Sequence, residues 1–144
     1  MEMSGGKKLR IGRMENRVRL FLNPQPEWEL EFDAGAAKID FDLSPLKVRS
    51  LLVDGGASSI RIRLGSLLKE AKVLVDAGAS SISIEIPHGV GCSLSVDAAL
   101  SSKRFEGFTE KEDGLYETED YWNADRRIEV SIDAGVSSLK VERY

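Results

Sequence analysis

Apolar and polar residues alternate along most of this chain, and the alternation is interrupted at regular intervals. Each interruption begins with an aspartate and has a glycine two positions later. Alternation with a period of two is typical of half-buried strands, and Asp-x-Gly between two such runs is typical of a turn. Eight turn residues are predicted on this basis: Asp33, Gly35, Asp54, Gly56, Asp76, Gly78, Asp133 and Gly135. We expect each aspartate to cap its own turn and the glycines, Gly78 among them, to adopt positive φ.

The repeated unit has a nearly constant length. Asp33, Asp54, Asp76 and Asp97 are separated by 21, 22 and 21 residues, and 36 residues separate Asp97 from Asp133. Aligning the units places apolar residues in shared columns, such as Leu30, Leu51, Val73 and Leu94, or Phe41, Ile62, Ile84 and Phe105. Parallel strands stacked about 4.8 Å apart require such columns. The predicted fold is therefore all-β, a right-handed parallel β-solenoid of about five rungs with 21–22-residue repeats.

The N-terminal part of the chain differs in charge from the remainder. Residues 1–26 carry six Lys or Arg and two Asp or Glu, so the remaining residues hold a net charge of −8 within a total of −4. We expect residues 1–16 to form a flexible basic arm and residues 17–144 to form a single domain. The alternating segment 17–22 would then be a first strand that covers one end of the stack. The acidic body argues against nucleic acid as a partner, because phosphate binding needs a basic surface.

Residues 101–127 interrupt the repeat and are rich in aromatic and acidic side chains. We expect this excursion to leave the stack and to return at Arg127 for the last rung. Aromatic residues dominate interface hot spots, and acidic residues would attract a basic partner. The candidate interaction residues are Phe108, Tyr116, Glu117, Glu119, Tyr121 and Trp122.

The alternative is that the excursion packs over the flank of the stack. Leu52 and Leu74 are apolar although their parity points outward, so they need a cover that the excursion could supply. We expect Trp122 to serve as part of this cover and the acidic rim, with Glu117 and Glu119, to serve in recognition.

Enzymatic chemistry has little support in the sequence. The single histidine, His88, and the single cysteine, Cys92, lie four positions apart, and no third group is placed to orient them. Stacked aspartates could chelate calcium, but each repeat lacks companion carboxylates at two-residue steps, which favours turn capping. We therefore predict no catalytic residues, no metal site and no cofactor.

The remaining features concern cellular context. One cysteine excludes an intramolecular disulfide, and no apolar run approaches the roughly 18 residues of a membrane span. No signal-peptide core is present, so a cytoplasmic or membrane-associated location is expected.

Several motifs resemble a known family. They are the bend Asp76–Ile82 (Asp-Ala-Gly-Ala-Ser-Ser-Ile), Ile86–Gly91, Phe105–Phe108 and the closing segment Ile132–Val141. In these motifs residues 17–144 resemble the soluble C-terminal domain of the LiaF-type cell-wall-active-antibiotics-response proteins and the wider group of adhesin-like β-solenoid domains.

The resemblance implies a non-enzymatic interaction domain that modulates a two-component system in the bacterial envelope-stress response. Its partner would be a sensor kinase or a membrane protein, and in the family the domain usually follows membrane helices. One alternative is a structural or adhesin-like β-solenoid that self-associates. A carbohydrate-active β-helix enzyme is disfavoured by the short rungs and the absence of a carboxylate or basic cluster.

Overall fold

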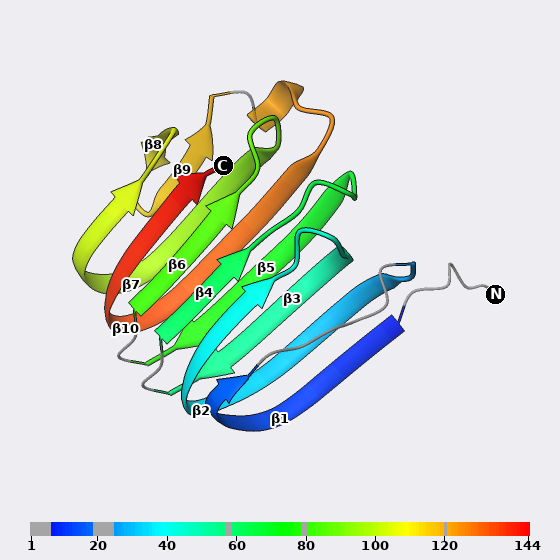
Figure 1. Cartoon of the computed structure of the whole chain (residues 1–144). Coiled ribbons are helices and arrows are strands. Elements are labelled where there is room, and N and C mark those ends of the chain that lie inside the picture. The colour runs from blue at the N-terminus through cyan, green and yellow to red at the C-terminus, as the bar shows by residue number, and fades with distance from the viewer. Residues whose placement is uncertain (1–6, 19–24, 57–58, 79–80, 120) are drawn as a thin grey trace.

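The computed structural model describes residues 7–18, 25–56, 59–78, 81–119 and 121–144 (Figure 1). This part of the chain consists of strands and one turn of 3-10 helix. The elements are β1 (Lys7–Val18), β2 (Glu27–Asp42), β3 (Lys47–Gly55), β4 (Ser59–Arg63), β5 (Glu70–Ala77), β6 (Ser81–Ile86), β7 (Gly91–Phe105), β8 (Phe108–Glu112), β9 (Leu115–Thr118), η1 (Tyr121–Asn123) and β10 (Arg127–Arg143). The prediction of an all-β fold with parallel strands is confirmed.

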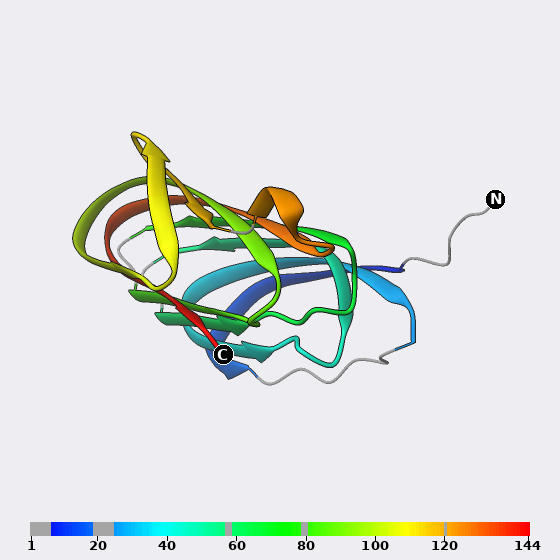
Figure 2. The same ribbon diagram turned by 90° about the horizontal axis from the view of Figure 1, so that it is seen from above.

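The strands form two layers that face each other across the core (Figure 2). The first half of β2 pairs with β3 and that of β10 with β5 in one layer, whereas their second halves pair with β4 and β6 in the other. β7 pairs with β10 in both layers. The long strands β2, β7 and β10 therefore curve from one layer into the other. In the shorter repeats two separate strands take their place: β3 and β5 lie in the first layer, and β4 and β6 follow them in the second. The buried positions are even-numbered before the curve of β2, as at Phe32, and odd-numbered after it, as at Ile39, so the alternation shifts by one residue at the curve.

The expected tight turns at Asp-x-Gly are therefore wrong for two of the four repeats. Asp33 and Gly35 lie inside β2, and Asp133 and Gly135 lie inside β10. The described glycines with positive φ are Gly89, Gly107 and Gly114, so the prediction for Gly78 is also wrong. The physical reason is that small residues let an extended backbone bend without entering the left-handed region. Residues 57–58 and 79–80, which follow Gly56 and Gly78, are outside the described residues.

The predicted columns are present in the strand register. Leu30 pairs with Leu51, and Leu51 pairs with Val73. In the second layer Phe41 pairs with Ile62, and Ile62 pairs with Ile84.

The order of the last two units differs from the chain order. Val130 of β10 pairs with Val73 on one side and with Leu94 of β7 on the other. The segment 127–143 therefore inserts between the third repeat and β7, whereas we expected it to be the terminal rung. Insertion is possible because the excursion between β7 and β10 is long enough for the chain to pass β7 and return beside it.

The N-terminal strand begins ten residues earlier than predicted. β1 pairs in parallel with β2, from Lys7 opposite Trp28 to Val18 opposite Ile39. Residues 7–16 are thus part of a strand rather than of a flexible arm, because their own alternation lets them pair with the open edge of β2. Of the expected covering strand 17–22, positions 19–22 lie outside the described residues.

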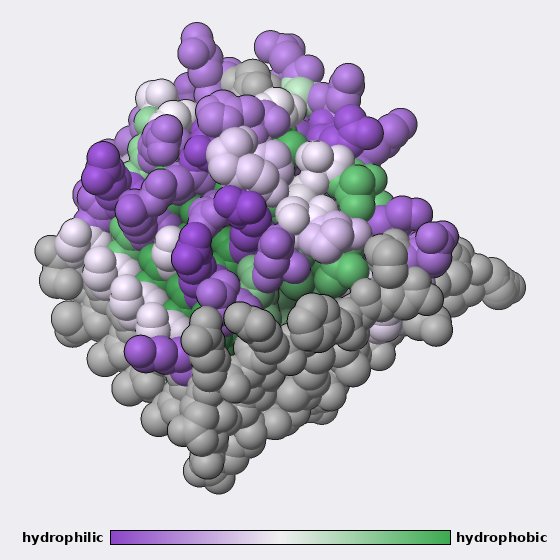
Figure 3. Space-filling view, in the orientation of Figure 1, coloured by the Kyte–Doolittle hydropathy of each residue, from purple (hydrophilic) through white to green (hydrophobic). Residues whose placement is uncertain are grey.

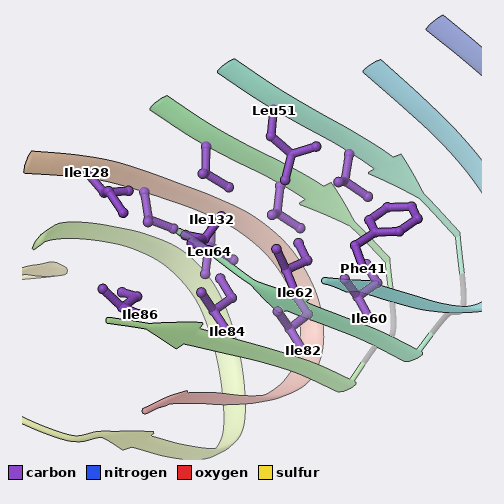
Figure 4. Close-up of a cluster of buried hydrophobic side chains, with 14 of the residues drawn as sticks. Phe41, Leu51, Ile60, Ile62, Leu64, Ile82, Ile84, Ile86, Ile128 and Ile132 are labelled. Carbon is purple, nitrogen blue, oxygen red and sulfur yellow. The ribbon is translucent and has the colours of Figure 1, made fainter. Parts of the chain in front are cut away.

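The core is a single apolar cluster between the layers (Figure 4). Phe32 in the first half of β2 and Phe41 in the second half meet across it, with ring centroids 4.4 Å apart. Val53, Val75, Ile62 and Ile84 are completely buried. Burial of each such side chain stabilises the fold by about 1.5–3 kcal/mol. Over most of the described face seen in Figure 3 the side chains are polar, as a two-layer sheet requires.

Candidate interaction site

The excursion forms a small antiparallel extension of the sheet. β8 pairs with β9, and β9 pairs with the first half of β7, where Tyr116 lies opposite Leu94. Gly107 and Gly114, with φ of 81° each, form the two tight turns of this segment.

This placement corrects the expectation that the excursion covers Leu52 and Leu74. β7 and β10 lie between β9 and β5, so the extension reaches sideways from the sheet instead of across its outer face. Leu74 is accordingly 45% exposed, and Leu52 is half-buried.

The six predicted interaction residues fall into two groups. Tyr116, Glu117 and Tyr121 are buried, and Phe108 is half-buried against the core. The Tyr116 ring packs edge-on against Phe105, with centroids 4.7 Å apart. Trp122 is 68% exposed, and Glu119 is exposed as well. Only Trp122 and Glu119 are therefore fully available to a partner.

Trp122 is exposed yet held by several contacts. Its ring meets Tyr121 edge-on at 5.0 Å, and the Arg127 guanidinium lies 5.8 Å from the Trp122 ring centroid. The indole Nε1–H donates to the Glu117 carboxylate over 3.2 Å, and Arg127 donates to the Trp122 carbonyl over 2.9 Å. The expectation that Trp122 packs as a cover is wrong, because its contacts fix the edge of the ring and leave much of the indole in solvent.

Backbone contacts anchor the segment that carries Trp122. The N–H of Gly91 donates to the carbonyl of Arg126 over 2.9 Å, and the N–H of Cys92 donates to the buried Thr118 hydroxyl over 3.0 Å. A Cβ atom on Gly91 would lie 2.8 Å from the Tyr121 Cα, so only glycine permits this approach. The roles of Gly91, Thr118 and Arg127 were not predicted from the sequence. Two signals were available in the sequence: Gly91 lies in the corner that begins at Pro87, and Arg127 is the residue at which the chain was expected to return to the stack.

Cys92 and His88 have different environments. Burial raises the pKa of the Cys92 thiol to about 12, although the nearby charge of Arg143 acts in the opposite direction. His88 is exposed, and its Nδ1 lies 2.7 Å from the Tyr144 carbonyl oxygen. A thiol with this pKa is a poor nucleophile at neutral pH, because only the thiolate reacts.

The repeated aspartates form a column across five strands. In register from β2 to β7, the order is Asp33, Asp54, Asp76, Asp133 and Asp97. All five are exposed, and none forms an ion pair with another described residue. The capping contacts expected for Asp54 and Asp76 would fall on residues outside the described set. Within the described ranges no three His, Cys, Asp or Glu side chains are arranged to hold a metal ion.

A small apolar hollow lies where the connectors meet the end of the core. It is lined by apolar side chains, among them Leu43, Leu64, Leu68 and Ile128, and its volume is about 20 Å³. This volume holds about one water molecule, whereas sites for small molecules usually measure about 300–1,000 Å³. The hollow therefore cannot accept a substrate or cofactor in this conformation.

Comparisons with known proteins agree with the fold. Residues 1–85 match the family described as "N-terminal domain of toast_rack, DUF2154". No curated protein matches the chain.

One solved structure with a similar fold is a putative cell adhesion protein from Clostridium sporogenes ATCC 15579. It is 22% identical, with a TM-score of 0.81 over 85% of this chain and 58% of that one. The chain thus spans little more than half of that protein's length. In the described part of the chain, no helix is long and apolar enough to cross a membrane.

Proposed function

Because the chain belongs to the family of the toast_rack N-terminal domain, we propose that it is a non-enzymatic interaction domain that modulates a two-component system in bacterial envelope-stress signalling. The family match supports this proposal, since the toast-rack fold occurs in LiaF-like proteins. We place the partner among sensor kinases and membrane proteins. We also propose that the repeats form a right-handed solenoid of about five rungs, and the parallel stacking of β2, β3, β5, β10 and β7 supports the stacked arrangement.

The observation that carries the proposal is the exposed but immobilised Trp122. An aromatic side chain that is already fixed loses little conformational entropy when a partner binds. Tryptophan and arginine are also the residues most often found at interface hot spots, and Arg127 lies against the Trp122 ring. Glu119 adds a negative charge at the same corner, which would speed the approach of a basic partner.

The test combines binding with a signalling readout. The purified chain is titrated against a bacterial sensor kinase of the envelope-stress class, and kinase autophosphorylation is followed in parallel. We expect Trp122→Ala to weaken binding by about tenfold or more and to abolish the effect on phosphorylation, as for a hot-spot residue. Its melting temperature is measured in parallel, because the variant also removes the N–H that donates to the buried Glu117 carboxylate.

Leu67→Ala is the matched control. Leu67 is 48% exposed on the connector that precedes β5 and is likewise apolar. If Leu67→Ala and Trp122→Ala weakened binding equally, the Trp122 corner would not be the interaction site. If neither the chain nor its variants changed phosphorylation, the signalling role would be refuted.

A structural or adhesin-like role is the second candidate, favoured by the similarity to the putative cell adhesion protein. It requires self-association of this chain. Sedimentation that stays monomeric up to high concentration would exclude it.

A further inference from the structure

The outer face of the first layer carries far more negative charge than the opposite face. Three columns of outward residues cross β2, β3, β5, β10 and β7, and eight of their members are acidic while one, Lys72, is basic. At the edge of these columns β1 places Lys8 opposite Glu29 and Arg10 opposite Glu31, and Arg49 pairs with Glu29 over 2.9 Å. The excess of negative charge is therefore concentrated in the aspartate column. We call the surface formed by the three columns the acidic face. In column order its residues are Glu29, Ser50, Lys72, Glu129, Ser93; Glu31, Leu52, Leu74, Ser131, Ser95; and Asp33, Asp54, Asp76, Asp133, Asp97.

The outer face of the second layer is balanced in comparison. Its corresponding columns hold five basic residues (Lys38, Arg61, Arg63, Arg104 and Lys140) and four acidic ones (Asp40, Asp42, Glu85 and Glu142). Arg61 and Arg63 both pair with Glu85, and Lys140 pairs with Glu142. The two faces share the same repeat and the same strand spacing, so the excess of acidic residues is specific to one side.

The middle column of the acidic face is partly apolar. Leu52 and Leu74 are adjacent in it, and beyond Ser131 and Ser95 the column continues to Leu115 of β9. Leu74 is 45% exposed, and the other two leucines are half-buried. Ser131 and Ser95 thus lie between Leu74 and Leu115 in this column. The aspartate column is parallel to it, two residues further along each strand. No described element covers this surface.

The spacing of the carboxylates suggests what could bind there. Like charges directly opposite each other on neighbouring strands destabilise a sheet. The five aspartates in register therefore lower the stability of the fold unless a partner neutralises them. Adjacent strands lie about 4.8 Å apart, which is close to the pitch of about 5.4 Å of an α-helix. Basic residues one turn apart on a helix that crosses the strands would therefore meet successive aspartates. An extended partner would present same-side residues about 6.6 Å apart, a poorer match.

We propose that the acidic face binds an amphipathic helix of a partner protein, with Lys or Arg at one-turn spacing over the aspartates and an apolar stripe over Leu52, Leu74 and Leu115. This surface is separate from the Trp122 corner and extends the interaction role to a second contact. Its test requires no signalling partner, so its failure would leave the signalling proposal untouched.

The probe is a synthetic helical peptide of about 18 residues, or five turns, with lysines at one-turn spacing beside a leucine stripe. A scrambled peptide of the same composition is the control for non-specific attraction. Binding to the full chain is measured by fluorescence anisotropy at low and moderate salt. We expect the designed peptide to bind at least about tenfold more tightly than the scrambled one, and salt to weaken both.

Two triple variants locate the site. Asp54→Asn/Asp76→Asn/Asp133→Asn should weaken binding by about tenfold, whereas Asp40→Asn/Asp42→Asn/Glu142→Gln changes the net charge equally on the opposite face and should change it less than about twofold. Leu74→Ser should weaken binding by about threefold or more through the lost apolar contact. The aspartate variant should melt at the same temperature or higher, so misfolding would not explain its loss of binding.

Four outcomes would overturn the proposal. They are no binding of the designed peptide, equal binding of the scrambled peptide, equal losses in the two triple variants, and unchanged binding by Leu74→Ser. A dimer that dissociates on aspartate substitution would instead assign the face to a second copy of the chain. Displacement of the peptide by calcium at millimolar concentration, with a raised melting temperature, would assign it to a cation.

Discussion

The stacked repeats and the excursion between β7 and β10 are stabilised in different ways. In the repeats, parallel strands place Leu, Ile, Val and Phe side chains in columns, and one apolar pattern recurs in every strand. In the excursion, the strands are antiparallel, two glycines have positive φ, and the polar side chains of Glu117 and Thr118 are buried. The stability of the repeats therefore depends on apolar side chains packed in columns, whereas the stability of the excursion depends on individual polar and steric contacts.

The largest effect is expected from a charge in an apolar column. Ile84 is completely buried between Ile62 and Val141, so Ile84→Asp would leave a carboxylate without a partner. A cost above about 4 kcal/mol is expected, enough to unfold most domains of this size. Arg61→Asp on the outer face of the same layer should leave the chain folded. Circular dichroism and urea titration distinguish the two, and similar destabilisation by both would refute the assigned register.

The columns could be predicted from sequence because each repeat presents the same apolar positions at the same distance from its aspartate. The order of the strands could not. Val130 and Leu94 both fit beside Val73, so spacing alone does not decide between β10 and β7 as its neighbour. Chain order favoured β7, but the structure places β10 there.

The glycines show a second limit of the sequence. A glycine after an aspartate occurs both where a strand curves, as at Gly35 in β2, and where a left-handed turn forms, as at Gly114. The residue type is the same, and the φ angle is decided by whether the strand continues or reverses. In the candidate site, the aromatic and acidic composition identified the segment. Exposure of Trp122 and burial of Glu117 followed from contacts with β7 and Arg127 that have no periodic signal.

A glycine comparison tests the two kinds of bend. A Cβ atom on Gly114 would lie 2.8 Å from the Val96 carbonyl oxygen, and its φ is 81°. Gly114→Ala should therefore destabilise the chain by about 1–3 kcal/mol. A Cβ atom on Gly78 would be 3.5 Å from its nearest neighbour, an ordinary contact, so Gly78→Ala should change stability much less. Thermal unfolding measures both, and a larger loss for Gly78→Ala would contradict the curved-strand interpretation.

A third comparison concerns a buried polar contact in the excursion. Thr118→Val keeps the shape of the side chain but removes the hydroxyl that accepts from the Cys92 N–H. The buried N–H would lose its partner, at a cost of about 1–3 kcal/mol. Thr109→Val is the control, because Thr109 lies exposed on β8. Hydrogen exchange at Cys92 should accelerate in the first variant only. Unchanged exchange in Thr118→Val would show that another group satisfies this N–H.

The smallest effect is expected from the ion pairs on the outer face of the second layer. Burial raises the pKa of Glu85, but hydrogen bonds from Arg61 and Arg63 outweigh this effect and leave the pKa below its ordinary value of 4.5. A carboxyl whose pKa is lower in the folded state stabilises the fold above the unfolded-state pKa, and this contribution is lost as the pH falls through the folded-state value. Glu85→Gln should therefore cost up to about 1 kcal/mol at pH 7, as is usual for ion pairs near the surface. The difference from the wild-type chain should shrink as the pH falls below about 4.5 and should also shrink with added salt.

Glu110→Gln is a suitable control, since Glu110 is exposed on β8 and forms no ion pair with a described residue. A difference for Glu85→Gln that stays constant from pH 7 to pH 3 would mean that the charge of Glu85 contributes nothing, and that the repeats are held by their apolar columns alone.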